Sequence, residues 1–554
     1  QADVLIRGGT FESSGFTIGA LPIYDPQTGH YLAELPVAPA MLGAPSVRTG
    51  SDNAISGWNA TAGRVAYGWL PVRAGGHLAV GGGDNDLFRS ELYSGYRSDL
   101  KLGGRTLSAD ASVAHSESDG TRTFGDHQLK RYNARLQLAN DVSQTDLFFG
   151  RQDKAFAWPN MYAARNFSTP IREEREDLET QLVILNHKVQ FGADGDYLQF
   201  GGYLRRNKDH YAIPAFGPAG HSFHVTDVSG LALDGRASVT ENTALLYRAG
   251  VIADEIGSTS LIVGPVNGRY NDRTQYYSGL FAEHTIDADS RHEWVLTGGA
   301  NYDDSNRHEG KLSPTAKLAV LSAGSFLETV YVSYAESSQL PSYTTLNNSN
   351  VGGLFQGDRN LGRSKSQNFE LGAGAQVATW RMKAAVFYRR DNNLVDWTYD
   401  ATALNTPGAT SREAEAVDID TVGLELIGRK DFGVVGLVLG YTLLDKIDDL
   451  PATRGSFYAL DYAEHRLTAA IVARLGAGFE LRMDNEARIQ EENALRRRND
   501  EVVLSSLGLY YSVPRVKGLT LSAQVDNLWN TYFEEVPLVP GARREWSVGA
   551  RYAW

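Results

Sequence analysis

The acidic and histidine side chains of this 554-residue chain are the first candidates for chemistry, because they act as acids, bases and metal ligands. The sequence contains no G-x-S-x-G, H-E-x-x-H, P-loop or EF-hand pattern, and it has no cysteine. Acidic clusters at 84–86 and 445–449 could hold calcium through loop oxygens, although solvated turn carboxylates give the same pattern. Histidines show no ligand spacing beyond His221 and His224. These residues favour a protein that is not an enzyme and has neither a metal site nor a cofactor.

The bulk composition excludes two further classes of protein. A net charge of −13 without a basic stripe argues against a nucleic-acid partner. The longest nearly apolar run, 432–444, is interrupted by three glycines and falls short of the roughly 18–20 residues of a membrane helix. A membrane β-barrel is still allowed, because each of its strands needs only about 9–11 alternating residues.

Alternation of apolar and polar residues is the dominant pattern from about residue 77 to the end. Within 132–138, one face has Tyr132, Ala134, Leu136 and Leu138, and the other has Asn133, Arg135 and Gln137. Soluble sandwiches and membrane barrels both alternate in this way, but they differ in their connections. Short connections such as 140–145 and 377–380 alternate here with long ones such as 158–174, 339–366 and 397–415. The sequence therefore predicts an all-β membrane protein, an antiparallel transmembrane β-barrel of about 22 strands.

The final residues predict how the barrel closes and how it is recognised. Apolar residues alternate up to Trp554, so this strand must pair with another to avoid an exposed edge. The stretch 547–554 resembles the C-terminal signal that outer-membrane barrels present to the barrel assembly machinery. Gly549, Tyr552 and Trp554 occupy the positions of that signal, whose last residue is more often Phe.

The first 75 residues have a different pattern, which predicts short apolar strands at 3–10 and 16–22 separated by glycine-rich turns. Such a segment is too small to form a core alone. The lumen of a large barrel would supply the missing partner, since 22-stranded barrels have a plugged lumen.

Several motifs resemble the TonB-dependent receptor family. The run Ile-Arg-Gly-Gly-Thr at 6–10, with 47–50 and 57–63, looks like the second half of its plug domain. The stretches 334–342, 360–372 and 423–426 resemble its mid-barrel signatures, and 525–530 with 540–543 resembles its last strands. The resemblance implies a partial plug domain at 1–75 and a barrel at 76–554. Members of that family have an energy-coupling box and the first half of the plug before the Ile-Arg-Gly-Gly-Thr run. Neither part is found here, and we expect that the given sequence is shortened rather than that the protein has lost them.

The resemblance also implies where the substrate binds, namely where the plug tips at 10–15 and 24–31 meet the long outer loops. Rings with polar groups suit sugars, corrin-like rings and siderophores equally, but aromatic residues near strand ends also form lipid-interface girdles. The expected contacts are Phe11, Ser13, Tyr24, Asp25, Gln27, Thr28, His30 and Tyr31 of the tips, and Trp158, Tyr162, Tyr343 and Trp397 of the loops. Arg7, beside Gly8 and Gly9, is expected to lock the plug in place rather than to bind substrate.

These implications predict TonB-dependent import of a compact, scarce nutrient, a cobalamin-like corrinoid or a ferric siderophore, across the bacterial outer membrane. The expected partners are TonB, the barrel assembly machinery, outer-membrane lipid and lipopolysaccharide, and the small-molecule substrate, without nucleic acid. The alternative is a structural or surface-scaffold barrel that has a reduced plug and no coupling to TonB.

Overall fold

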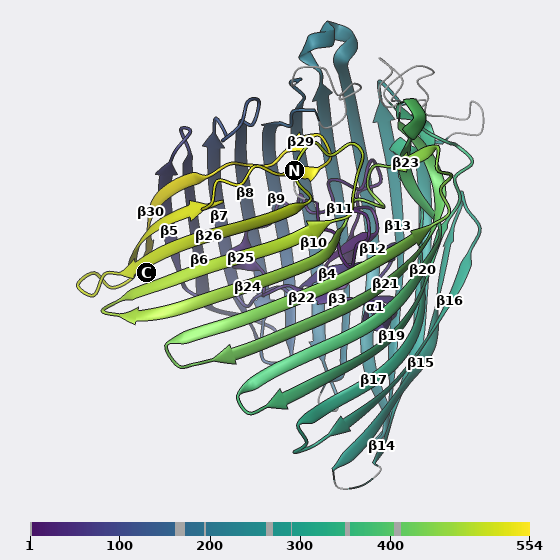
Figure 1. The fold of residues 1–554 in the computed structure, drawn as a ribbon. Helices are drawn as coiled ribbons and strands as arrows, with labels where there is room; N and C mark the ends of the chain where they lie inside the picture. Colours follow the sequence, from purple (N-terminus) through teal and green to yellow (C-terminus); the bar gives the residue numbers. More distant parts are fainter. Residues whose placement is uncertain are drawn as a thin grey trace.

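The computed structural model describes residues 3–160, 172–192, 195–261, 270–287, 289, 291–348, 355–403 and 412–554. These residues form a closed antiparallel barrel of 22 strands that surrounds a small N-terminal sheet (Figure 1). Within the described ranges, no helix has the length and apolar character needed to cross a membrane.

The barrel strands follow one another around the ring in chain order. They are β5 Gly75–Gly83, β6 Phe88–Leu102, β7 Arg105–Ser118, β8 His127–Ala139, β9 Ser143–Ala157, β10 Arg175–Gln190, β11 Tyr197–Ala212, β12 His221–Thr240, β13 Thr243–Ser258, β14 Asp272–Asp287, β15 His292–Ser305, β16 Lys311–Ser322, β17 Leu327–Gln339, β19 Ser364–Val377, β20 Trp380–Asp400, β21 Arg412–Asp431, β22 Val435–Asp448, β24 Ala463–Gly476, β25 Phe479–Gln490, β26 Glu501–Ser512, β27 Leu519–Asp526 and β30 Glu545–Ala553. Shorter elements belong to the long connections: η2 Pro214–Gly220, α2 Tyr343–Asn347, β18 Phe355–Gln356, η4 Ala401–Ala403, β23 Arg454–Ser456, β28 Glu534–Val536 and β29 Val539–Pro540.

The two rims of the barrel differ as the connection lengths predict. The β8–β9 and β19–β20 turns lie on a short-turn rim, whereas the β9–β10, β17–β19 and β22–β24 connections lie on a long-loop rim (Figure 1). The predicted number of about 22 barrel strands is also confirmed. The expected loop at 397–415 is shorter, because β20 extends to Asp400 and β21 begins at Arg412. These strands exceed the roughly 9–11 residues that cross a bilayer, so Trp397 lies on a strand beyond the lipid.

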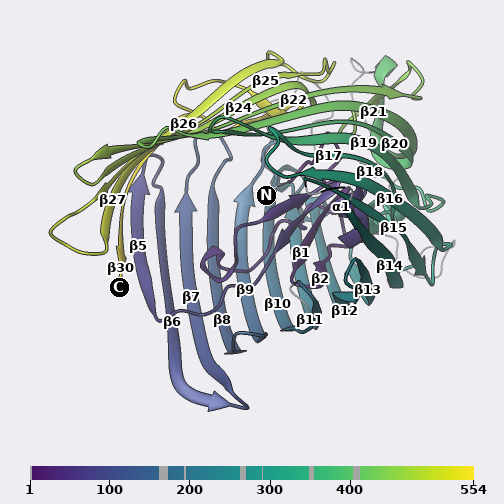
Figure 2. The ribbon, with the colours of Figure 1, turned by 90° about the horizontal axis from the view of Figure 1, so that it is seen from below.

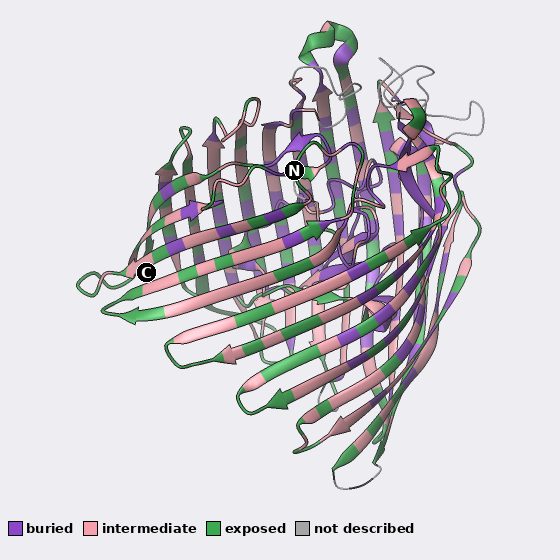
Figure 3. Cartoon of the chain, in the orientation of Figure 1, coloured by how far each residue is buried: buried purple, intermediate pink, exposed green. Residues whose placement is uncertain are grey.

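The faces of the strands also follow the predicted alternation (Figure 3). On β8, Tyr132 and Leu136 are exposed on the outside, whereas Arg135 points inward and is 2% exposed. Arg135 Nη2 pairs with Asp110 on β7 at 2.6 Å. The apolar faces therefore form the outer surface, which in the membrane contacts lipid.

The strand β30 closes the ring by pairing with β5, with Gly549 opposite Gly81 and Tyr552 opposite Leu78. The backbone N–H of Trp554 donates to the carbonyl oxygen of Gly76 at 3.1 Å. Trp554 and Tyr552 point outward and are about half exposed. This pairing removes the sheet edge that an open last strand would present.

The N-terminal residues 3–74, here called the luminal segment, lie inside the ring (Figure 2). The segment contains β1 Ser14–Ile18, β2 Leu21–Ile23, η1 Pro39–Met41, β3 Ser46–Arg48, α1 Gly50–Ser56 and β4 Gly63–Tyr67. The strands form one sheet in the order β2-β1-β4-β3, with β1 parallel to β4. The expected strand at 3–10 does not form, because Arg7 and Gly8 adopt positive φ values of 51° and 66° that turn the chain.

The hydrophobic core of the luminal segment is completed by the barrel wall. Ile18 and Leu21 of the segment are fully buried in one cluster with Phe148 of β9 and with Leu182 and Ile184 of β10. On another side, α1 contacts β15, β16, β17 and β19. A segment of this size buries too little surface alone, so the wall is part of its folded state.

Candidate functional site

A cavity of about 210 Å³ lies between the luminal segment and the long-loop rim, and we call it the vestibule cavity. Its floor belongs to the luminal segment, and its walls come from β10, β11, β12, β20 and the long connections. The described lining residues include Glu12, Gln27, Thr28, His30, Tyr31, Glu176, Asp209, Tyr211, Phe216, His224, Ser342, Thr344, Phe355, Trp397 and Tyr458.

The floor loop is shaped by Asp25, which is 2% exposed. Its Oδ2 accepts hydrogen bonds from the backbone N–H of Gly29 at 3.0 Å and of Tyr31 at 3.2 Å. Gly29 has a φ of 78°, which favours glycine at this turn. The carboxylate of Asp25 thus organises the loop that presents Gln27, Thr28, His30 and Tyr31 to the cavity.

The structure places five of the predicted binding residues on the cavity lining. They are Gln27, Thr28, His30, Tyr31 and Trp397. The Trp397 ring packs edge-on against Phe355, with 5.0 Å between centroids. A polar floor from the luminal segment therefore faces an aromatic wall.

Phe11 and Ser13 lie next to the cavity floor and are absent from the described lining. Phe11 stacks on the His30 ring at 3.7 Å between centroids and meets Tyr458 edge-on at 5.2 Å. Ser13 Oγ donates to the carbonyl oxygen of Thr10 at 2.8 Å. Both side chains support the floor from within the segment.

Tyr24 and Tyr343 are buried around Arg273 of β14 instead of lining the cavity. Arg273 Nη2 donates to the Tyr24 hydroxyl at 2.8 Å, and the Tyr343 hydroxyl donates to Asp254 Oδ1 at 2.6 Å. Arg273 Nε also pairs with Asp254 Oδ1 at 3.3 Å. This network ties the luminal segment and α2 to the wall strands β13 and β14.

The two remaining predicted loop residues have different outcomes. Trp158 is outside the described lining and packs against Phe156, with 6.3 Å between ring centroids. Its backbone N–H donates to the carbonyl oxygen of Glu174 at 2.7 Å, at the base of the β9–β10 connection. Tyr162 lies outside the described residues.

Unpartnered acceptor atoms surround the vestibule cavity. The acceptor atoms Gln27 Oε1, Glu176 Oε2 and Asp209 Oδ1 are buried without a hydrogen-bond partner among the described residues. His224 Nδ1 is also unpartnered there, and it accepts or donates according to the tautomer of the ring. No lysine or arginine occurs in the described lining. Leaving a buried acceptor unpaired costs about 1–3 kcal/mol. The cavity therefore favours a ligand that supplies hydrogen-bond donors or positive charge.

Glu12 adds a carboxyl group whose charge depends on pH. Its Oε1 accepts a hydrogen bond from Ser342 Oγ at 3.2 Å. The pKa of Glu12 is raised to about 8, mainly by burial and in part by the charges of Asp25 and Asp396, against the lowering effect of the hydrogen bond from Ser342. Near neutral pH, Glu12 is therefore largely protonated and can donate a hydrogen bond.

Arg7 ties the luminal segment to the wall away from the cavity. Its Nη1 pairs with Glu370 Oε2 at 2.5 Å, and its Nη2 pairs with Glu425 Oε2 at 2.6 Å. The guanidinium lies 4.3 Å from the centre of the Phe387 ring. The carbonyl oxygen of Gly8 accepts a hydrogen bond from Lys446 Nζ at 2.5 Å. The several N–H donors of one guanidinium allow Arg7 to pair with two carboxylates at once.

The neighbouring glycines allow this close approach. A Cβ on Gly8 would lie 2.9 Å from Leu444 Cδ1, and one on Gly9 would lie 2.4 Å from Ala62 Cβ. Larger residues at either position would push Arg7 away from its carboxylates.

Sequence reasoning missed three wall residues of the cavity, Glu176, Asp209 and His224. All three occupy inward-facing positions near the long-loop ends of β10, β11 and β12. Alternation could show that they face the lumen, but many other inward-facing residues share that signal. Only the packing of the luminal segment against these strands selects them.

Comparisons with known proteins agree with this architecture. Residues 46–528 match the family model for the TonB-dependent receptor-like β-barrel. Comparison with curated protein sequences gives no match.

Solved structures also resemble the chain. The FrpB iron transporter from Neisseria meningitidis (F3-3 variant) has a TM-score of 0.76 at 14% identity, over 99% of this chain and 93% of that one. The copper transporter OprC has a TM-score of 0.76 at 13% identity, over 100% of this chain and 94% of that one. The siderophore receptor PirA from Pseudomonas aeruginosa has a TM-score of 0.72 at 14% identity, over 99% of this chain and 93% of that one. At such identities these likenesses show the fold alone. With the family match over most of its length, the chain belongs to the TonB-dependent receptor family of Gram-negative outer-membrane proteins.

Proposed function

We propose that this receptor imports a compact nutrient that is rich in hydrogen-bond donors or positively charged, by a route coupled to TonB. The observation that carries the proposal is the set of unpartnered acceptors around the vestibule cavity. In this proposal, residues 1–75 act as a partial plug and residues 76–554 as the barrel. Arg7, Gly8 and Gly9 hold the plug against the wall while substrate binds above it.

The size and chemistry of the cavity narrow the substrate class. A volume of about 210 Å³ is below the roughly 300–1,000 Å³ of usual ligand pockets, so it fits a small ligand or one end of a larger one. A cobalamin-like corrinoid offers amide donors, and a ferric hydroxamate chelate is neutral or positive. A ferric catecholate is strongly negative, and no lysine or arginine in the described lining would offset its charge.

A binding experiment tests this substrate class. Cyanocobalamin, a neutral ferric hydroxamate and a ferric catecholate are titrated into the purified protein in an uncharged detergent. We expect binding of at least one of the first two at least tenfold tighter than that of the catecholate. The variant Glu176→Gln should weaken that binding at least tenfold, about 1.4 kcal/mol. Glu255→Gln, a change at an exposed position of strand β13, is the matched control and should bind as the wild type does.

Uptake into cells with and without TonB separates import from the scaffold alternative. Accumulation of the bound ligand that requires TonB supports import. Tight binding without TonB-dependent accumulation, or equal binding of all three ligands, would contradict the proposal.

A further inference from the structure

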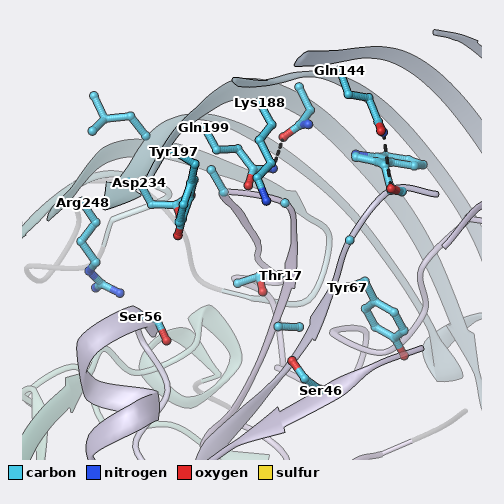
Figure 4. A pocket seen from close by; sticks show the side chains of 18 of the residues that line it. Thr17, Ser46, Ser56, Tyr67, Gln144, Lys188, Tyr197, Gln199, Asp234 and Arg248 are labelled. Carbon is cyan, nitrogen blue, oxygen red and sulfur yellow. Dashed lines mark hydrogen bonds between the residues drawn. The ribbon is translucent and has the colours of Figure 1, made fainter. Parts of the chain in front are cut away.

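A second, larger cavity of about 730 Å³ lies on the short-turn side of the luminal segment (Figure 4). Thr17, Ser46 and Ser56 line it from the segment, and the wall residues come from strands β9 to β14 and from the β8–β9 turn. None of its described lining residues belongs to the vestibule cavity. It is a separate site on the other side of the segment.

Four cationic side chains line this cavity, and we call it the basic cavity. Arg48 and Arg64 belong to the luminal segment, while Lys188 and Arg248 belong to β10 and β13 of the wall. The described lining has only two carboxylates, Asp141 and Asp234. The cavity therefore has an excess of positive charge, opposite in sign to the vestibule cavity.

Two of the guanidinium groups are buried and incompletely paired. Arg64 and Arg248 are 7% and 8% exposed, and the Nε atom of each has no hydrogen-bond partner among the described residues. Arg64 Nη1 donates to the carbonyl oxygen of Ser56. Arg248 lies 5.0 Å from the centre of the Tyr277 ring. Within the described part of the chain, neither guanidinium forms an ion pair with a carboxylate.

The cations also lie close enough to repel one another. The pKa of Arg64 is lowered to about 9, mainly by burial and in part by the charges of Arg48 and Arg248, against the opposing effect of Asp234. Arg48 Nη1 donates to Ser56 Oγ at 3.0 Å, beside the contact of Arg64. Buried guanidinium groups with too few counterions are costly, so an anion would relieve both the desolvation of Arg64 and Arg248 and the repulsion among the cations.

The carboxylate of Asp234 can accept a further hydrogen bond from a ligand in the basic cavity. Its Oδ2 accepts a hydrogen bond from the Tyr197 hydroxyl at 2.8 Å, while its Oδ1 is buried without a partner among the described residues. Figure 4 shows Asp234 beside Tyr197 and Arg248 on the wall. A ligand that has both an oxyanion and a hydroxyl would satisfy the guanidinium donors and this acceptor.

We propose that the basic cavity binds a small hydroxyl-bearing oxyanion, such as hydrogen phosphate or a hydroxycarboxylate, which bridges the luminal segment and the barrel wall. Planar guanidinium groups recognise phosphate and carboxylate through paired hydrogen bonds. Because Arg64 is on the segment and Arg248 is on the wall, the bound anion holds the two together. This inference does not depend on the substrate of the vestibule cavity.

Calorimetric titration of inorganic phosphate, citrate and tricarballylate into the full chain tests the proposal. Tricarballylate has the three carboxylates of citrate without its hydroxyl. We expect phosphate and citrate to bind, with tricarballylate at least fivefold weaker than citrate. Arg248→Gln should weaken phosphate and citrate at least tenfold. Arg206→Gln, which removes an exposed arginine of β11 paired with Asp227, should leave both unchanged.

A chemical probe makes the test independent of variants that fold poorly. The chain has no cysteine, so Ser46→Cys places a single thiol on the cavity lining. At each position, the modification rate with an anionic methanethiosulfonate is divided by the rate with a cationic one. This ratio should be at least fivefold higher for Ser46→Cys than for Ala323→Cys, which lies in the exposed β16–β17 turn. Phosphate should slow the reaction at Ser46→Cys. Absence of phosphate and citrate binding, unchanged binding in Arg248→Gln, citrate no tighter than tricarballylate, or equal reagent preferences at the two cysteines would overturn the proposal.

Discussion

The protonation of Glu12 makes the stability of the luminal segment depend on pH. It contacts Ser342 of the β17–β19 connection, and burial raises its pKa from 4.5 to about 8. The folded state therefore binds a proton that the unfolded segment releases between these two values. This contribution to stability is fully present below about pH 4.5 and is lost as the pH rises through about 8.

The variant Glu12→Gln should reduce this loss, because glutamine keeps the protonated shape and does not titrate. We expect the wild-type segment to lose roughly 1–4 kcal/mol more stability than Glu12→Gln between pH 5 and pH 9. The measurement is urea unfolding followed by a fluorophore on Ser46→Cys. Glu255→Gln should retain the wild-type slope, and identical slopes in all three proteins would show that Glu12 does not titrate in this window.

The side chain of Arg7 fixes the position of the luminal segment against the barrel wall. It is 7% exposed, and the carboxylates of Glu370 and Glu425 neutralise it from strands β19 and β21. Removing one partner of such a buried pair typically costs about 3–5 kcal/mol, because the remaining charge is left uncompensated. The same pairs add little net stability over apolar packing, so their role is to set the position of the segment.

Between neighbouring strands, aromatic rings cover glycines directly opposite them. Gly423 faces Phe387 across β20 and β21, and Gly372 faces Tyr331 across β17 and β19. A Cβ on Gly423 would lie 2.2 Å from Phe387 Cζ, so the ring occupies the space that a side chain would take. Because Phe387 also packs on Arg7, this strand pair shapes the attachment of the luminal segment.

The variant Gly423→Ala should displace the Phe387 ring and loosen the segment. Overpacking of this kind costs about 1–3 kcal/mol, measured as a lower urea midpoint of the segment in the Ser46→Cys assay. The control is Gly374→Ala on β19, where the nearest atom would be Thr329 Cβ at 3.8 Å. Equal midpoints for the two variants would contradict the role of the ring.

At the scale of the whole molecule, the luminal segment separates the vestibule cavity from the basic cavity, which have opposite chemistry. The vestibule cavity presents unpartnered acceptors, whereas the basic cavity presents unpartnered guanidinium donors. Both depend on a closed ring, which is completed where β30 pairs with β5. Gly549, Tyr552 and Trp554, the predicted assembly signal, all lie on or next to this last strand.

Replacing Trp554 with serine tests whether the last strand is read during assembly. We expect a several-fold lower amount of folded barrel in the outer membrane, measured by heat-modifiable gel mobility. Trp294→Ser on β15 is the control, because Trp294 is a comparably exposed outward-facing tryptophan away from the seam. If both variants assemble equally well, Trp554 has no special role as a signal.

Much of the architecture was predictable because its causes are local. Side chains of a strand alternate with period two, so Tyr132 and Arg135 could be assigned to opposite faces from their spacing alone. Turn residues mark the connections, and their unequal lengths predicted a barrel with two different rims. The floor loop around Gln27 and His30 was identified through its resemblance to a plug tip.

The partners of each side chain depended on distant parts of the chain meeting in the lumen. Tyr24 and Tyr343 were expected on the binding surface, but Arg273 and Asp254 engage them in the wall. Conversely, Glu176 and Arg248 carry no local signal that separates them from other inward-facing residues. Contacts across a closed barrel join residues hundreds of positions apart, and alternation specifies which way a side chain points but not what it meets there.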